Sequence, residues 1–182
     1  VFMGAVIDQA AFDKIMGYID YANNSSQVEI LYGGRGDSRV GYFVEPTVLR
    51  VDSPTDKLMK EEIFGPVLSV YVYPDNKFEK VLQVCDRTSP YGLTGSIFAQ
   101  DRSAINTALR KLRQAAGNFY INDKPTGAVV GQQPFGGSRA SGTNDKAGSP
   151  LNLMRWLSPR TIKENFNPPR EDFRYPYMKT LS

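Results

Sequence analysis

The feature that most constrains the fold is the alternation of apolar strand patterns and amphipathic helix patterns between residues 67 and 121. Short apolar runs predict strands at 67–73, 93–99 and 119–121. Between them, Asp75 and Asp101 are candidate N-caps of two helices, and Gly117 is a candidate stop for the second helix. Strand–helix–strand–helix–strand order is typical of an α/β sheet with right-handed crossovers. We therefore predict an α/β fold.

The N-terminal part of the chain predicts one further helix and two strands. Apolar residues from Phe12 to Ala22 recur at helical spacing behind Asp8, which predicts a helix over 8–22. Strands are expected at 28–32 and 43–51, and Pro46 inside the second suggests an edge position. The glycine cluster at 33–37 lacks the strand–GxGxxG–helix context of a phosphate loop, so we interpret it as a hairpin connection.

The single cysteine, Cys85, shares its predicted helix face with Phe78, Val81 and Leu82. We interpret it as a small core residue, because Arg87 is the nearest cation and no base is close in sequence. The chain contains no histidine, so it holds neither a Ser–His nor a Cys–His pair, nor a histidine metal site. One cysteine also means that no disulfide forms within the chain.

Composition narrows the classes of partner. The net charge is +3 and basic and acidic residues are interleaved without a basic stripe, so a nucleic-acid partner is not expected. The longest apolar run, 67–73, is far shorter than the ~20 residues of a membrane helix, and the N-terminus shows no signal-peptide pattern. No membrane association is therefore expected. The first residue is valine rather than methionine, which suggests a processed product or an excised piece.

A glycine-rich segment at 117–145 is the first candidate site. Compact domains seldom carry a structureless loop longer than ~12–15 residues unless it is functional or disordered, and Val129 and Phe135 argue against disorder. Glycine amides can form an anion-binding concavity, Lys124 and Arg139 add positive charge, and Phe135 could wall an apolar channel. The segment predicts a site for a small anionic molecule with an aliphatic part; an ordinary surface connection is the alternative. The glycines lie at positions 117, 127, 131, 136, 137 and 142.

An acidic turn, Glu61-Glu62 followed by Phe64-Gly65-Pro66, is the second candidate site. A carboxylate here could accept hydrogen bonds from ribose hydroxyls while Phe64 packs on a flat ring. The alternative is a solvated acidic pair beside a buried phenylalanine. If the strands at 67–73 and 119–121 are parallel, this turn and the glycine-rich loop lie at opposite edges of one sheet. A shared cleft then requires an antiparallel strand or a long reach.

The C-terminal part combines apolar residues with prolines. Residues 153–157 and 161–163 flank Ser158-Pro159-Arg160 and suggest a projecting strand that pairs with another segment or subunit. A strand that folds back on its own domain is the alternative.

Several of these segments together resemble the aldehyde dehydrogenase superfamily. The segments are EEIFGPV at 61–67, GNFYIN at 117–122 and PFGGS at 134–138, while the run at 126–145 resembles its L-glutamate γ-semialdehyde (1-pyrroline-5-carboxylate) dehydrogenase branch. The likeness extends over essentially the whole chain. It implies that residues 1–150 are the C-terminal part of a catalytic α/β domain with a three-layer, mostly parallel sheet. Residues 151–182 are then an oligomerisation strand and tail.

The resemblance also implies roles for five residues. Glu62 is expected to hold the nicotinamide ribose of NAD, with Phe64 beside it. Gly127 and Ala128 are expected to anchor the α-carboxylate and amino end of the substrate through their amides, and Phe135 to contact its aliphatic middle. Animal members carry serine where this chain has Ala128, and the lost hydroxyl removes one possible hydrogen bond, worth ~0.5–1.5 kcal/mol.

The implied activity is oxidation of L-glutamate γ-semialdehyde to glutamate with NAD⁺ in proline breakdown. In the family, the nucleophilic cysteine, the oxyanion asparagine and the main nucleotide-binding domain precede these segments, so no catalytic residue is expected here. The chain is expected to be an inactive C-terminal segment that forms a homo-oligomer through residues 154–163. Its expected location is the mitochondrial matrix in a eukaryote and the cytoplasm otherwise. Two alternatives are a non-catalytic binding or assembly module and a dehydrogenase for another acidic semialdehyde.

Overall fold

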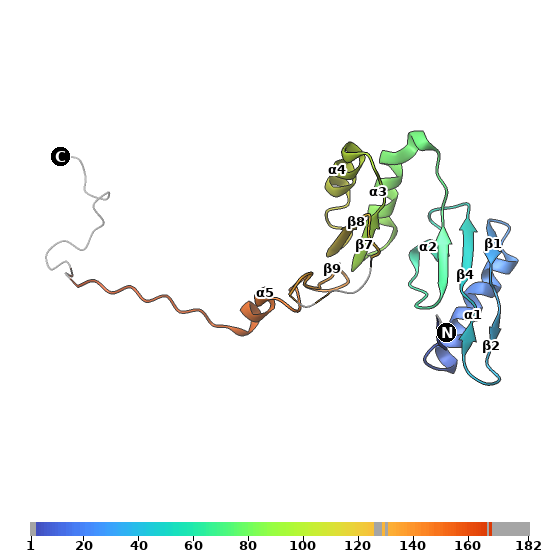
Figure 1. The fold of residues 1–182 in the computed structure, drawn as a ribbon, viewed down its shortest axis with the longest axis horizontal. Helices are drawn as coiled ribbons and strands as arrows, with labels where there is room; N and C mark the ends of the chain where they lie inside the picture. The colour runs from blue at the N-terminus through green and yellow to red at the C-terminus, as the bar shows by residue number, and fades with distance from the viewer. Residues whose placement is uncertain (1–2, 126–128, 130, 167, 169–182) are drawn as a thin grey trace.

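A computed structural model describes residues 3–125, 129, 131–166 and 168 of the chain. Figure 1 shows two lobes and an extended C-terminal segment. We call residues 3–70 the N-terminal lobe, residues 75–156 the C-terminal lobe and residues 157–166 the tail. The structure confirms the predicted α/β class, because each lobe combines helices with a pair of parallel strands.

The core of the N-terminal lobe is helix α1 packed on a three-stranded sheet. Helix α1 (Gln9–Asn24) begins behind Asp8, whose carboxylate accepts a hydrogen bond from the Ala11 amide at 2.8 Å. Its buried stripe, Ile15, Ile19 and Ala22, joins residues of the sheet in the core. The strand order is β1 (Val28–Tyr32), β4 (Thr47–Val51), β5 (Val67–Val70); β1 is antiparallel to β4, and β4 is parallel to β5. The predicted helix and first strand are confirmed.

Two predictions about residues 33–51 are wrong. The predicted second strand divides at Pro46 into β3 (Phe43–Val44), which pairs with β2 (Gly36–Asp37), and β4, which is the central strand of its sheet rather than an edge. Proline lacks an N–H, and at this break between two strands it interrupts no ladder bond. The chain reverses between β2 and β3, at 38–42, so residues 33–35 are a kink between β1 and β2 rather than the hairpin connection. Gly33 and Gly34 form this kink with φ of +75° and +88°.

The C-terminal lobe contains two parallel strands, β7 (Thr94–Ile97) and β8 (Asn118–Ile121), and a smaller antiparallel pair, β6 (Tyr91–Gly92) and β9 (Ser138–Arg139). Helix α3 (Phe78–Thr88) precedes β6 and helix α4 (Arg102–Lys111) follows β7. The predicted order of elements is confirmed, but the single sheet is wrong. The β5 ladder ends at Val70, and residues 71–74 then lead into the other lobe, so β5 pairs with β4 and β7 with β8.

The predicted helix ends are partly confirmed. Asp101 caps α4 and accepts a hydrogen bond from the Ser103 amide at 2.8 Å. Asp75 instead opens a 3-10 turn, η1 (Asp75–Lys77), and α3 begins after it. Helix α4 ends at Lys111, with Leu112 as its C-cap, so Gly117 does not end the helix. Gly117 instead allows another segment to approach closely, because a Cβ there would lie 1.9 Å from the Gly136 carbonyl oxygen.

Cys85 does not lie in the core of this chain. Its side chain is exposed and, with Phe78 and Val81, lines an apolar hollow of about 300 Å³ between the lobes. The apolar surroundings raise the pKa of its thiol, which disfavours the thiolate that a nucleophile requires.

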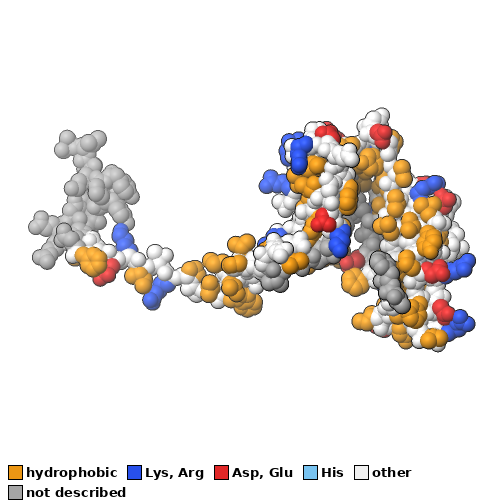
Figure 2. All heavy atoms as spheres, in the orientation of Figure 1, with side chains coloured by type: hydrophobic (Ala, Val, Ile, Leu, Met, Phe, Trp, Pro, Cys, Tyr) orange, Lys and Arg blue, Asp and Glu red, His pale blue; other side chains and the backbone are white. Residues whose placement is uncertain are grey.

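The end of the C-terminal lobe is helical rather than extended. Helix α5 (Pro150–Leu153) and the 3-10 turn η2 (Met154–Trp156) replace the strand predicted at 153–157. The tail beyond them has no regular structure and projects from the lobe, so the fold-back alternative is wrong for these residues. Figure 2 shows apolar side chains along this projecting part of the chain. Within the described ranges, no helix has the length and apolar character of a membrane span.

Candidate functional site

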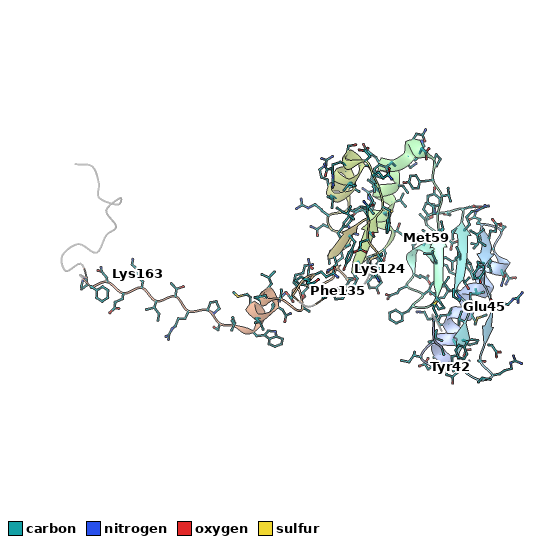
Figure 3. The ribbon with its side chains drawn as sticks, viewed as in Figure 1. Tyr42, Glu45, Met59, Lys124, Phe135 and Lys163 are labelled. Carbon is teal, nitrogen blue, oxygen red and sulfur yellow. The ribbon has the colours of Figure 1, made fainter. Side chains whose placement is uncertain are left out.

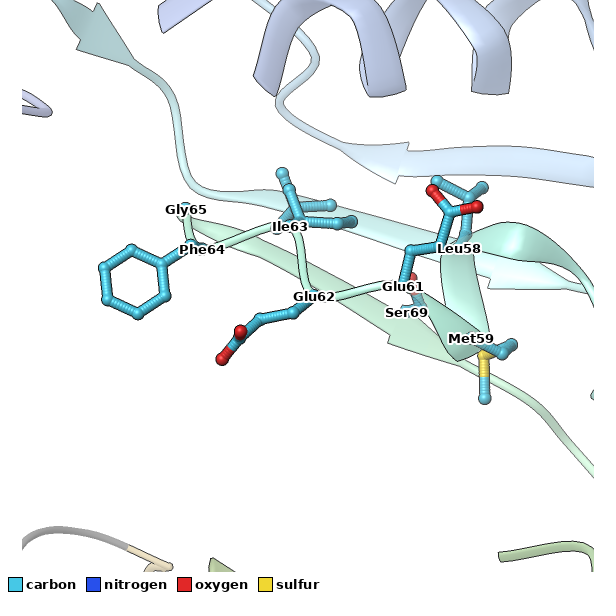
Figure 4. Close-up of a pocket in the computed structure, with 9 residues that line it drawn as sticks. Leu58, Met59, Glu61, Glu62, Ile63, Phe64, Gly65 and Ser69 are labelled. Atoms are coloured by element: carbon cyan, nitrogen blue, oxygen red, sulfur yellow. The ribbon is translucent and has the colours of Figure 1, made fainter. Parts of the chain in front are cut away.

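The acidic turn forms one side of an open hollow of about 410 Å³ in the N-terminal lobe. It follows the short helix α2 (Lys57–Lys60), whose N-cap Asp56 accepts a hydrogen bond from the Leu58 amide at 2.8 Å. Leu58 and Ile63 are buried and anchor the two ends of the segment, while Lys60, Glu61 and Glu62 between them are exposed. The hollow, shown in Figure 4, is lined by Leu58, Met59, Glu61, Glu62, Ile63, Phe64, Gly65, Val67 and Ser69.

The two adjacent glutamates have different environments. The Tyr18 hydroxyl donates a hydrogen bond to Glu61 Oε2 at 2.7 Å, and this bond, together with partial burial, raises the pKa of the Tyr18 phenol. The carboxylate of Glu62 makes no hydrogen bond or ion pair with any residue that the structure describes. Figure 4 shows the two carboxylates pointing in different directions. Glu62 is therefore the member of the pair that is available to a ligand.

Phe64 is exposed, so the alternative of a buried phenylalanine is wrong. The residue is 84% exposed, and its backbone has a φ of +59°, a conformation that costs a non-glycine residue free energy. The next residue, Gly65, lies against helix α1: a Cβ at Gly65 would come within 2.5 Å of Ile15 Cδ1. The backbone thus contacts the helix while the Phe64 ring faces outward beside Glu62.

Ser69 is a lining residue that the sequence did not indicate. Its hydroxyl oxygen is buried and has no hydrogen-bond partner among the described residues. Ser69 lies between the apolar residues Leu68 and Val70 of β5, and nothing in this local pattern distinguishes it from an ordinary strand residue.

The glycine-rich loop uses most of its described amides internally. Gly117 donates to the Gly92 carbonyl at 2.8 Å, Gly131 to the Gly148 carbonyl at 3.3 Å and Gly136 to Asn118 Oδ1 at 3.1 Å. Gly142 donates to the Arg139 carbonyl at 3.5 Å. The expectation that these four amides line an anion-binding concavity is wrong. The amides of Gly127 and Ala128 lie outside the described residues, and their substrate roles stay predictions.

The two positively charged side chains of the loop differ in whether their charge is paired within the chain. Arg139 forms an ion pair with the Asp86 carboxylate and also donates to the Asp86 carbonyl, so its charge is compensated within the chain. Lys124 is exposed, and its amine makes no hydrogen bond or ion pair with a described residue. Of the two, only Lys124 offers an uncompensated positive charge.

Phe135 is held in place by its backbone. It is half-buried, and it exchanges two hydrogen bonds with Ala147, at 2.9 and 2.7 Å. Just beside it, the buried side chain of Asn118 donates to the Pro134 carbonyl at 3.1 Å and accepts from the Gly136 amide. The Lys146 amine donates to the Gly117 carbonyl at 2.6 Å. Asn118 and Lys146 thus position the segment that carries Phe135, a role that residue types alone did not indicate.

The structure does not bring the two candidate segments into one pocket. The acidic turn precedes β5 and the loop follows β8, and these two strands belong to different sheets. The two segments therefore do not lie at opposite edges of one sheet, which was the arrangement expected for parallel strands. The hollow beside Glu62 is lined by the N-terminal lobe. Figure 3 shows Met59 in that lobe and Lys124 and Phe135 in the other.

Among the described residues, no cluster of three or more His, Cys, Asp or Glu side chains could hold a metal ion.

Comparison with known proteins defines the class. Residues 1–162 match the aldehyde dehydrogenase family, and the chain therefore belongs to this family. The match confirms the resemblance inferred from the acidic turn and the glycine-rich loop.

The most similar relatives include one branch of the family from several organisms. The mitochondrial delta-1-pyrroline-5-carboxylate dehydrogenase of Dictyostelium discoideum is 64% identical over 177 residues, which cover 97% of this chain and 32% of that protein. The human protein of the same name is 54% identical over 178 residues, which cover 98% of this chain and 31% of that protein. This chain therefore spans about a third of the length of these curated relatives.

Solved structures agree with the fold. A crystal structure of the delta-pyrroline-5-carboxylate dehydrogenase from Mycobacterium tuberculosis matches 97% of this chain and 32% of that one, with a TM-score of 0.80 and 57% identity. A second structure of that protein, bound with NAD, matches with a TM-score of 0.78 and 56% identity, over 97% of this chain and 31% of that one.

Proposed function

We propose that this chain is the C-terminal third of an NAD-dependent dehydrogenase that oxidises L-glutamate γ-semialdehyde to glutamate. The identity of 64% to a delta-1-pyrroline-5-carboxylate dehydrogenase supports the reaction class. The observation that carries the proposal is the unpaired Glu62 carboxylate at the open hollow, next to the exposed Phe64 ring.

These two side chains fit the nicotinamide riboside part of NAD. An ionised carboxylate accepts hydrogen bonds only, and its two oxygens suit the two hydroxyls of a ribose. The exposed ring of Phe64 offers an apolar contact to the neighbouring flat nicotinamide. When bound, NAD⁺ supplies the hydride acceptor for aldehyde oxidation. Glu62 orients the ribose, and Phe64 limits the access of water to one side of it.

The substrate contacts belong to the C-terminal lobe. In this proposal, the backbone amides of Gly127 and Ala128 bind the α-carboxylate and amino end of the semialdehyde, and Phe135 contacts its aliphatic chain. The Phe135–Ala147 and Asn118 hydrogen bonds support it, because they hold the Phe135 segment in one position. Binding across both lobes requires that residues outside this chain complete the site.

The nucleophile is also expected outside these residues. The only cysteine, Cys85, has a thiol pKa raised above its ordinary value, and no histidine exists in the chain to act as its base. We therefore propose that the chain by itself does not turn over substrate. Two further parts of the proposal are assembly into a homo-oligomer through residues 154–163 and a mitochondrial matrix location in a eukaryote, otherwise cytoplasmic. Curated eukaryotic relatives are named mitochondrial.

A segment exchange tests the function. The hybrid enzyme is the Dictyostelium discoideum relative with its matching segment replaced by this chain. We expect NAD⁺ reduction with L-glutamate γ-semialdehyde from the hybrid enzyme and none from the chain alone. A folded hybrid enzyme without turnover, or turnover by the isolated chain, contradicts the proposal. A higher kcat/KM for succinate semialdehyde would instead indicate a dehydrogenase for another acidic semialdehyde.

A further inference from the structure

Helix α1 contacts the acidic turn along one stripe of polar side chains. Lys14, Tyr18 and Tyr21 are spaced by four and three residues, so they lie on one face of the helix. The Lys14 amine donates to the Glu62 carbonyl oxygen at 3.0 Å, the Tyr18 hydroxyl to Glu61 Oε2 at 2.7 Å, and the Tyr21 hydroxyl to Asp56 Oδ2 at 2.9 Å. Successive turns of α1 therefore hold successive points of the segment 56–62.

The start of the same segment is held by a cation. The Lys57 amine lies 3.8 Å from the centre of the Tyr21 ring and 5.3 Å from the centre of the Tyr18 ring, within the range of a cation–π interaction. Below the polar stripe, the buried Ile15 leaves no room for a side chain at Gly65. The turn is thus held by α1 at its start, at both glutamates and at its end.

These contacts separate the roles of the two glutamates. Tyr18 occupies the Glu61 carboxylate, while Lys14 binds Glu62 only through its backbone carbonyl. The Lys14 bond holds the peptide group that follows the Glu62 Cα, and with it the direction in which the side chain leaves the backbone, without using the carboxylate. The Glu62 carboxylate has no hydrogen-bond or ion-pair partner among the described residues, and Glu62 lines the hollow.

We propose that Lys14 and Tyr18 are positioning residues that hold Glu62 in the direction required for binding the ribose of NAD. The inference rests on the proposed function, since it assigns to Glu62 the ribose contact named there. It adds that the geometry of this contact is set by a helix 40 or more residues earlier in the chain, through a carbonyl and a neighbouring carboxylate.

The test uses steady-state kinetics of the hybrid enzyme. Lys14→Met removes the donor but retains an apolar side chain of similar length. We expect it to raise the KM for NAD⁺ about threefold to tenfold, with kcat and the KM for the semialdehyde nearly unchanged. Lys14→Arg keeps a cationic donor and is expected to hold the KM for NAD⁺ within about twofold of the parent value. Tyr18→Phe, which releases Glu61, is expected to change the same constant in the same direction.

The matched control is Lys80→Met, on the exposed side of α3, where the lysine makes no ion pair with a described residue. It is expected to leave all three constants unchanged. If Lys14→Met instead caused a general loss of folding, its kcat and its melting temperature would both fall. Lys14→Arg would then restore kcat and the melting temperature together. A rise in the KM for NAD⁺ with unchanged kcat and unchanged melting temperature is specific to positioning.

A double substitution separates the two claims. If Lys14 acts through Glu62, Lys14→Met causes no further rise in the KM for NAD⁺ when Glu62→Gln is already present. An equal rise in both backgrounds overturns the inference, as does an unchanged KM in Lys14→Met while Glu62→Gln raises it. If Glu62→Gln itself leaves the KM for NAD⁺ unchanged, the ribose contact of the proposed function is wrong and the inference fails with it.

Discussion

Ile15 links the stability of the N-terminal lobe to the shape of the acidic turn. Its side chain has no exposed surface, and it lies directly below Gly65. We expect Ile15→Ala to lower the free energy of unfolding by about 2–5 kcal/mol, because it removes buried carbon and leaves a cavity. Urea unfolding followed by circular dichroism measures this change.

The matched control for that prediction is Ile7→Ala. Ile7 is 90% exposed, so the same substitution there is expected to change the free energy of unfolding by no more than about 0.5 kcal/mol. Equal losses at Ile7 and Ile15 would mean that α1 does not pack on the sheet as described.

Asp37 gives a pH-dependent prediction. The Arg39 guanidinium donates to both carboxylate oxygens, at 2.7 and 3.0 Å, and these bonds lower the pKa of Asp37 from 3.8 to about 2. A lowered folded-state pKa means that the stabilisation is present above pH 3.8 and is lost as the pH falls towards 2. The carboxyl carbon chemical shift of Asp37 should therefore titrate near 2, and Arg39→Met should move the midpoint back towards 3.8. A midpoint of 3.8 in the parent chain would show that the pair does not form.

At the scale of elements, Asn118 connects strand β8 to the loop that carries Phe135. Asn118→Ala leaves the Pro134 carbonyl and the Gly136 amide without their partner in a partly buried position. We expect a loss of about 1–3 kcal/mol in the free energy of unfolding and faster proteolysis between residues 131 and 147. Limited proteolysis with mass spectrometry locates the cleavage sites.

Asn106, on the exposed face of α4, is the control position. Asn106→Ala is expected to leave the cleavage rate unchanged, since alanine favours a helix and no described contact is lost. If both alanine variants are cleaved at the parent rate, Asn118 does not hold the loop.

Some elements were predictable because their determinants are local. Helix α1 follows from a cap at Asp8 and an apolar stripe within sixteen residues. Gly117 was misassigned because its requirement comes from Gly136, which approaches it from a distant part of the chain. The two glutamates of the acidic turn are equivalent in sequence, and only Tyr18, 43 residues away, distinguishes them. The candidate site could thus be located from its motif, but the free carboxylate could not be assigned from local pattern.

At the scale of the whole molecule, sheet pairing was the least predictable property. The pattern between residues 67 and 121 correctly gives the order of strands and helices, yet it does not determine which strands share a ladder. Strand pairing depends on packing between residues far apart in the sequence, and here β5 pairs with β4 while β7 pairs with β8. The consequence for function is that the acidic turn and the Phe135 loop lie in separate lobes, which is consistent with a site completed by further residues.

The exposed C-terminal part supports an assembly prediction. Trp156 is 81% exposed and Ile162 73%, and contiguous exposed apolar residues commonly mark a protein–protein contact. We expect light scattering after size-exclusion chromatography to show the hybrid enzyme as an oligomer. The double variant Trp156→Ser with Ile162→Ser should have a smaller mass, because each substitution removes apolar area from the contact. The double variant Ile7→Ser with Val40→Ser is the control, since both side chains are 90% or more exposed but lie in the N-terminal lobe. The same mass for all three proteins, or an equal decrease in the control, would exclude residues 154–163 as the contact.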